Sequence, residues 1–237
     1  MKILLAVVFI LAPSVAFAWG PLTHIYLGNE IYYLGSLLPA AVFNLLKRYR
    51  EDYLYGNLMA DTILAKRFLP AHQNTHSWDI ALGMYETARK PSEKAFSLGY
   101  MSHLAADTVA HNIYTTNRKN IGHTVMELRA DSFIGQQYWV QAMRINKQIR
   151  CRNDVFLEKS VTPAIFKFKT NKRIFRSMVF LSVLNTERVG DFIDRNFFLS
   201  ARREDIQKLH AESVNRIIDV LCKRDLSPVL RKNPAAR

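Results

Sequence analysis

The sequence predicts an all-α protein built as a single multi-helix domain. Apolar residues recur at helical spacing through most of the 237 residues. No stretch shows the sustained alternation of apolar and polar residues that is typical of strands, and no Asn-Gly hairpin turn occurs. Glycine is scarce, at 9 residues, which also argues against a protein rich in strands and tight turns.

The same periodicity divides the chain into expected helices. The longest apolar helix begins at Ser92, a good N-cap residue, and carries Glu93 in its first turn. The expected helices are 22–37, 39–49, 53–65, 77–88, 92–114, 122–143, two or three within 162–198 and 203–223. Breaks are expected at 68–73, 115–121 and 150–159, and residues 228–237 are expected to form a flexible basic tail.

The composition is that of a globular protein with a cationic exterior. Hydrophobic residues make up 49% and charged residues 22%, which excludes a disordered chain, a collagen and a short disulfide scaffold. The net charge of +13 is concentrated in the second half: residues 132–237 hold 21 Lys/Arg against 10 Asp/Glu, whereas residues 19–131 hold 11 against 10. A solubilising coat and a surface for an anionic partner, phospholipid or nucleic acid, are both open interpretations.

The first 18 residues have the pattern of a secretory signal peptide. Lys2 precedes the unbroken apolar run 3–11, and Ala16-Phe17-Ala18 supplies a small-residue cleavage site. The run is shorter than the ~20 residues that span a bilayer. We therefore expect a signal peptide at 1–18 and a domain at 19–227 that is exported, periplasmic or secreted, and monomeric.

Export would affect the chemistry of two parts of the chain. Cleavage after Ala18 would make Trp19 the new N-terminus, whose α-amino group, with a pKa near ~7.7, can bind a metal together with its own carbonyl. The alternative is that Trp19 is only the first ordered residue of the core. The two cysteines, Cys151 and Cys222, could pair in an oxidising compartment, and the sequence leaves this open.

Histidines and carboxylates in the first half of the chain suggest a metal site. Six of the seven histidines lie between residues 24 and 123. His103, Asp107 and His111 are spaced by four on an otherwise apolar helix, so their side chains share one face. His123 and Glu127 repeat this spacing. A buried histidine or aspartate needs a partner, which a metal supplies.

Either pair alone is more often a hydrogen-bonded core pair than a metal site. Two pairs within 25 residues change that balance, and His24, Asp61 and His76 are further candidate donors. His72 is an alternative to His76, although the interval from Asp61 favours His76. Together with Trp19 this makes nine candidate ligands, enough for up to three zinc ions.

This ordered set resembles the zinc-dependent phospholipase C and single-strand nuclease superfamily, whose members are exported all-helical enzymes with a trinuclear zinc site. The resemblance covers about half of the mature chain. The matching elements are Trp19-Gly-x-x-x-His24, Asp61, His76, His103-x-x-x-Asp107, His111 and His123-x-x-x-Glu127. The contexts Thr75-His76-Ser77-Trp78-Asp79 and Gly99-Tyr100-Met101-Ser102-His103 look more like bacterial phospholipase C-type proteins.

The resemblance also implies how three zinc ions would share these ligands. One zinc would be held by Asp61, His76, His103 and Asp107, a second by Trp19, His24 and the bridging Asp107, and a third by His111, His123 and Glu127. His111 departs from the family pattern, because the corresponding histidine of the characterised enzymes comes two residues later. His111 is therefore expected either as a third-site ligand or as a hydrogen-bond donor to a ligand.

The activity that the resemblance implies is phosphodiester hydrolysis. The first interpretation is a phospholipase C that cleaves phospholipid head groups by zinc-activated hydroxide, with Asp61 orienting or deprotonating the water. The alternatives are a zinc-dependent single-strand nuclease or nucleotidase acting on nucleic acid, and a catalytically degenerate metal-binding module. The basic second half would suit peripheral contact with an anionic membrane surface.

Overall fold

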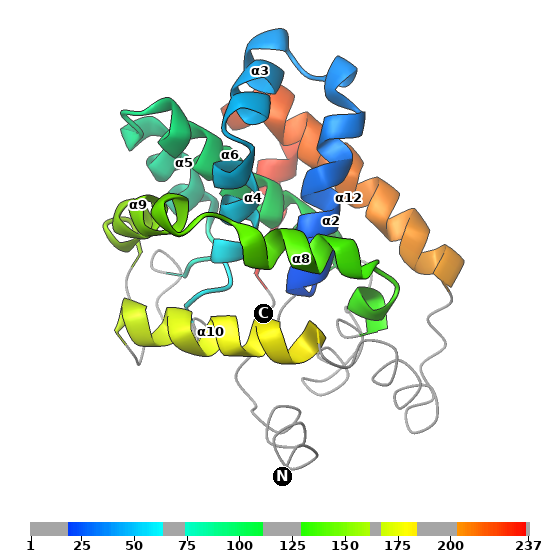
Figure 1. The fold of residues 1–237 in the computed structure, drawn as a ribbon. Helices are drawn as coiled ribbons and strands as arrows, with labels where there is room; N and C mark the ends of the chain where they lie inside the picture. The colour runs from blue at the N-terminus through cyan, green and yellow to red at the C-terminus, as the bar shows by residue number, and fades with distance from the viewer. Residues whose placement is uncertain (1–18, 64–73, 111–128, 162–166, 184–202, 236–237) are drawn as a thin grey trace.

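The computed structural model describes residues 19–63, 74–110, 129–161, 167–183 and 203–235, with side chains to residue 176 in the fourth segment. Every regular element in these residues is a helix (Figure 1). The all-α prediction is therefore confirmed. No helix of the described part is long and apolar enough to cross a membrane.

Helix α6 (Pro91–Val109) forms the centre of the molecule. Its side chains are buried without interruption from residue 95 to its end. Helices α4 (Arg50–Met59), α12 (Arg203–Lys223) and α5 (Trp78–Thr87) pack around α6, and α2 (Pro21–Tyr33) packs on α4 and α12 (Figure 1). A helix enclosed on all sides has to be apolar or small, so each polar residue on it needs a buried partner.

Helices α4 and α6 touch through their backbones at two glycines. A Cβ atom added at Gly56 would lie 2.1 Å from the carbonyl oxygen of Phe96, and one added at Gly99 would lie 2.0 Å from that of Tyr53. Only glycine fits at such a close approach. This crossing fixes the position of α4 relative to the middle of α6.

An outer layer covers the central helices. The 3-10 helix η1 (Gly35–Leu37) and α3 (Ala40–Arg48) lie at one end of the molecule, and α8 (Gln136–Arg144), α9 (Lys147–Glu158) and α10 (Phe168–Val183) lie at the other (Figure 1). Asp52 of α4 is buried and binds two α9 side chains, Arg152 at 2.6 Å and Asn153 at 2.7 Å. This ion pair, with Asp52 buried and Arg152 half-exposed, joins the outer layer to the core.

Several predicted boundaries are wrong. The helix expected at 53–65 ends at Met59, where the N–H of Thr62 closes a tighter turn on the Met59 carbonyl at 3.1 Å. Within the described residues, the helix expected at 122–143 is interrupted before α8 begins at residue 136. Helix α2 ends at residue 33, so the helix expected at 22–37 continues only as η1.

Helix α9 occupies residues where a break was expected at 150–159. Asn146 caps it, since its side chain accepts a hydrogen bond from the N–H of Gln148 at 2.8 Å. Its inward stripe is narrow, with Ile149, Asn153 and Leu157 spaced by four. Such a stripe is easily overlooked in a segment that is otherwise charged.

The C-terminal segment also differs from the expectation of a flexible tail at 228–237. Residues Pro228–Arg231 form the 3-10 helix η6, in which Val229 is buried. The indole N–H of Trp78 donates to the carbonyl of Lys232 at 2.9 Å. The start of the tail is thus packed against the body. The two cysteines, Cys151 and Cys222, are free thiols and form no disulfide.

Candidate metal centre

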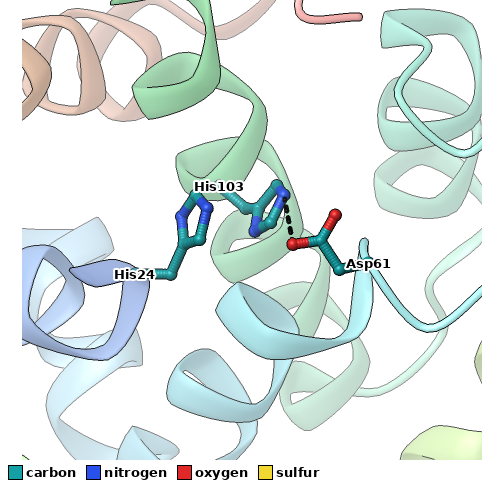
Figure 2. Close-up of side chains that lie close together, drawn as sticks. All are labelled: His24, Asp61 and His103. Carbon is teal, nitrogen blue, oxygen red and sulfur yellow. Dashed lines mark ion pairs between the residues drawn. The ribbon is translucent and has the colours of Figure 1, made fainter. Parts of the chain in front are cut away.

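Five of the predicted ligands converge in the interior of the helical body. His24 comes from α2, Asp61 from the turn after α4, and His103 and Asp107 from α6. His76 comes from the segment just before α5. All five side chains are buried. Figure 2 shows His24, Asp61 and His103 pointing toward one another from three different parts of the chain.

The donor atoms are spaced as the ligands of one metal centre would be. Asp107 uses one oxygen toward His24, with Oδ1 3.2 Å from Nε2. Its other oxygen, Oδ2, lies 2.8 Å from Nε2 of His76 and 3.1 Å from Nε2 of His103. Oδ1 of Asp61 lies 3.3 Å from Nε2 of His76, and Oδ2 of Asp61 lies 3.7 Å from Nε2 of His103. Ligands at ~2.1 Å from a tetrahedral zinc lie ~3.4 Å apart, and these distances bracket that value.

Two overlapping groups of donors can be distinguished within the cluster. His24, Asp61 and His103 form one, and His76, His103 and Asp107 form the other, with the donor atoms of each group within 4.8 Å of one another. The structure thus places Asp61, His76, His103 and Asp107 together, as the resemblance implied for one zinc. It also places His24 beside Asp107, the residue expected to bridge two ions.

The ring of His103 is held in one tautomer by the backbone of α4. Its Nδ1 lies 2.8 Å from the carbonyl oxygen of Asn57. A carbonyl oxygen only accepts hydrogen bonds, so Nδ1 carries the proton and Nε2 presents its lone pair to the other donors. This is the usual way in which a protein orients a metal-binding imidazole.

The loop that carries His76 is fixed to α6 one turn before His103. The hydroxyl of Tyr100 donates to the carbonyl of Thr75 at 2.6 Å. The backbone N–H of His76 donates to the side chain of Asn74 at 2.9 Å. These two hydrogen bonds set where the imidazole of His76 enters the site.

The first turn of α2, which carries His24, is capped by Asp131. One carboxylate oxygen accepts from the backbone N–H and the hydroxyl of Thr23, at 2.9 and 2.7 Å, and the other accepts from the N–H of Leu22 at 3.3 Å. Burial raises the pKa of Asp131 to about 6 in spite of these hydrogen bonds. A Cβ at Gly20 would lie 2.2 Å from the Asp131 carboxylate, so a side chain at this position would displace the cap.

The electrostatics of the cluster favour a bound cation. Burial alone would raise the pKa of Asp107, but positive charge beside it, carried by His103 and His24 when they are protonated, holds that pKa well below its usual range, and a bound cation would supply the same charge with the rings neutral. Burial lowers the pKa of His24 and so favours its neutral ring. A carboxylate and a neutral imidazole are the protonation states in which these side chains bind metals.

Hydrogen bonding gives a second test of whether the residues fit a metal. Neither ring nitrogen of His24 and neither oxygen of Asp107 makes a hydrogen bond of ordinary geometry with another described residue, although all four atoms are buried. Only Nδ1 of His24 has no close polar contact among the described residues; Nε2 of His24 and both oxygens of Asp107 meet other donors of the cluster at 2.8 to 3.2 Å without a well-formed hydrogen bond. Burying atoms that are so poorly paired costs free energy. A zinc ion among them would supply the missing partner, and the nitrogen and oxygen donors suit zinc.

Trp19 lies against α6 beside the centre. Its indole is fully buried, and the indole N–H lies 3.1 Å from the carbonyl of Ala106 and 3.2 Å from the hydroxyl of Ser213 on α12. Ala106 precedes Asp107 in the chain. The indole therefore belongs to the core, as the simpler interpretation of Trp19 expected, and the metal-binding role of its amino group stays a prediction.

The third predicted site lies outside the described residues. This applies to His111, His123 and Glu127, and also to His72. Sequence reasoning missed three residues that support the centre: Asn57, Tyr100 and Asp131. Asp131 follows Glu127 at the spacing of four of the predicted ligand pairs, but that spacing would indicate a metal ligand and not the cap of α2.

A family model described as zinc dependent phospholipase C matches residues 23–172, which is more than half of the chain. The matched range includes all five converging donors. The chain belongs to the zinc-dependent phospholipase C family. No curated protein and no solved structure matches the chain. The family therefore rests on the sequence, and the geometry of the five donors fits the metal that the family uses.

Proposed function

We propose that this protein is an exported phospholipase C that uses zinc to hydrolyse the phosphodiester bond between a phospholipid and its head group. The observation that carries the proposal is the buried cluster of three histidines and two aspartates in a member of this family. The described residues that form the cluster come from separate segments, so their convergence is a property of the fold.

Asp107 is suited to join two metal positions. Its two oxygens point to different partners, Oδ1 to His24 and Oδ2 to His76 and His103. Bound zinc would supply Lewis-acid polarisation of the phosphoryl oxygens and activation of water. Asp61 is the candidate to orient that water and take its proton, since it belongs to one donor group and lies 3.3 Å from His76 of the other.

Two finer features complete the proposal. Processing after Ala18 would free the amino group of Trp19 as a further ligand on the His24 side of the centre. His111, His123 and Glu127 would hold a third zinc. Processing would also place the protein in the periplasm or outside the cell.

The first experiment measures zinc content and substrate preference on protein that begins at Trp19. Monomeric short-chain phosphatidylcholine and single-stranded DNA are the two substrates, each tested with and without chelator. We expect close to three zinc ions per chain and chelator-sensitive cleavage of the lipid only. Cleavage of DNA in preference to lipid would make the protein a nuclease, and zinc binding without either activity would make it a metal-binding module.

The second experiment tests the N-terminus as a ligand. Protein that begins at Trp19 is compared with protein that carries one additional glycine before Trp19. If the Trp19 amino group binds zinc, the extended protein is expected to bind one zinc at least ~10-fold more weakly at unchanged thermal stability of the zinc-free form. Equal zinc affinity of both forms would show that Trp19 serves only as a core residue. The variant Asp107→Asn, which removes the expected bridging ligand, shows how large a loss of zinc affinity is when a ligand is deleted.

A further inference from the structure

Helix α10 has two faces of opposite character. Phe168, Asn171 and Phe175 are buried and lie on one side of the helix. Lys169, Arg173 and Arg176 are exposed and are spaced by four and three, so they form a single face on the opposite side. The sixteen residues of α10 contain no Asp or Glu. Among the described side chains of α10, the exposed ones are Lys169, Arg173, Arg176 and the uncharged Thr170, so this side carries positive charge and no negative charge.

A fourth cation of α10, Lys172, faces the interior of the protein. Lys172 forms an ion pair with Asp154 of α9, and its amino group lies 5.8 Å from the centre of the Tyr55 ring. Asp154 also accepts a hydrogen bond from the Tyr55 hydroxyl at 2.6 Å. Asp154 is thus paired within the layer, with Lys172 and with the Tyr55 hydroxyl.

The inner face of α10 is anchored to the helices that carry metal donors. Phe175 packs in one cluster with Leu22, which lies two residues before His24 on α2. Lys172 meets Tyr55 on α4, the helix that ends just before Asp61. Figure 1 shows α10 running beneath the start of α2 and the end of α4. Whatever binds the outer face of α10 is therefore held close to the metal centre.

We propose that the outer face of α10, formed by Lys169, Arg173 and Arg176, binds the surface of an anionic phospholipid bilayer and holds the metal centre at the membrane. This inference rests on the proposed function, because a phospholipase must work where its substrate lies. Cationic side chains near an anionic bilayer surface each contribute attraction that falls off within a Debye length. Because one side of α10 carries several positive charges and no negative charge, these charges can contact a flat bilayer surface together.

The test measures binding to vesicles, separately from catalysis. Vesicles of phosphatidylcholine mixed with phosphatidylserine are compared with vesicles of phosphatidylcholine alone in a sedimentation assay, with a metal chelator present to prevent turnover. The test variant is Lys169→Gln/Arg173→Gln/Arg176→Gln. We expect the wild type to bind only the mixed vesicles, with affinity that falls as salt is added. The variant is expected to bind them about 100-fold more weakly.

The control variant, Lys47→Gln/Arg48→Gln/Lys208→Gln, removes three exposed positive charges from α3 and α12. It is expected to keep wild-type vesicle binding. The proposal is overturned if the wild type does not prefer mixed vesicles, or if both variants lose binding equally, which would indicate a general effect of net charge. It is also overturned if the α10 variant loses binding to single-stranded DNA and keeps binding to vesicles.

Hydrolysis of monomeric short-chain phosphatidylcholine separates this inference from the proposed function. The α10 variant is expected to hydrolyse the monomeric lipid at the wild-type rate, since its substitutions lie on the outer face. If the wild type binds mixed vesicles through α10 but hydrolyses no phospholipid, the proposed function is wrong, while the inference that α10 binds membranes is supported. Circular dichroism melting checks that both variants are folded.

Discussion

Helices α6 and α10 show two opposite ways of placing polar residues on a helix. On α6, which is enclosed by other helices, His103 and Asp107 face inward and meet the other donors. On α10, which is covered on one side, Lys169, Arg173 and Arg176 face outward, whereas Lys172 pairs with Asp154 inside the layer. The same residue spacing, i and i+4, thus builds a metal centre in one case and a charged surface in the other. Burial of the helix decides between the two outcomes.

Breaking the enclosure of α6 is expected to have the largest effect. The substitution Gly99→Ala places a Cβ 2.0 Å from the carbonyl oxygen of Tyr53, and neither backbone can yield without separating α4 from α6. We expect a loss of more than about 4 kcal/mol in the free energy of unfolding, measured by urea denaturation. The matched control is Gly83→Ala on α5, where a Cβ would meet no atom within 4 Å. It is expected to stabilise the protein by about 0.5 to 1 kcal/mol.

Acid is expected to weaken the interior through His210 of α12. This ring is buried and lies 5.1 Å from the ring of Trp19. Burial lowers the pKa of His210 to about 4. The unfolded chain, with a histidine pKa of ~6.5, therefore binds the proton more readily than the fold, and stability falls as the pH drops below ~6.5.

Between pH ~7 and pH ~5 this one group is expected to remove about 2 kcal/mol of stability. Urea denaturation of the metal-free protein at both pH values measures the loss, and the His210→Gln variant serves as the reference. The difference between the two proteins isolates the contribution of His210. An equal loss in both would mean that His210 titrates normally in the folded protein.

Removing one buried hydroxyl from α6 is expected to have a smaller effect on stability but a specific effect on metal binding. Tyr100→Phe deletes the hydrogen bond to the Thr75 carbonyl that fixes the His76 loop. We expect a cost of about 1 kcal/mol in stability and about 10-fold weaker zinc binding, measured by chelator competition. Tyr32→Phe deletes an equivalent hydrogen bond, to the Leu46 carbonyl at 3.1 Å, away from the site. Tyr32→Phe should leave zinc affinity unchanged. If it weakened zinc binding as much as Tyr100→Phe, the effect of Tyr100→Phe would not be local to the site.

A substitution on the exposed face of α10 is expected to change the stability of the protein least. Lys169→Gln removes a charge that faces solvent. The free energy of unfolding is expected to change by no more than about 0.5 kcal/mol, in a urea denaturation run beside Gly99→Ala. A change above 1 kcal/mol or so would show that this lysine contributes to packing, and the contrast between the two helices would weaken.

The sequence predicted best those helices whose apolar pattern is strong. The 203–223 prediction coincides with α12, and the helix expected from residue 92 is α6, which begins one residue earlier. Helix α9 was missed because its inward stripe is a single residue wide and includes a polar residue, Asn153. The early end of α4 depends on a turn at Thr62 that helical spacing does not reveal.

The candidate site was predictable where a ligand pair lies on one helix and much less so where the fold joins distant segments. His103 and Asp107 follow from their spacing alone. The roles of Asp131 and of the Asn57 carbonyl depend on which segments lie side by side, and local patterns do not encode this. The backbone contact at Gly56 and Gly99 shows the same limit. In the sequence, a glycine within a helix indicates only low helix propensity.

The glycine contact between α4 and α6 has a consequence for how the protein acquires its metal. Because two backbones in contact fix α4 against α6, packing and not an ion sets His103 and Asp107 beside the turn that carries Asp61. Under the proposed export, the chain can then fold on the far side of the membrane and take up zinc last, from whatever that compartment offers. Loading would be a matter of ion supply and affinity, and the protein should release and regain its metal without passing through an unfolded state.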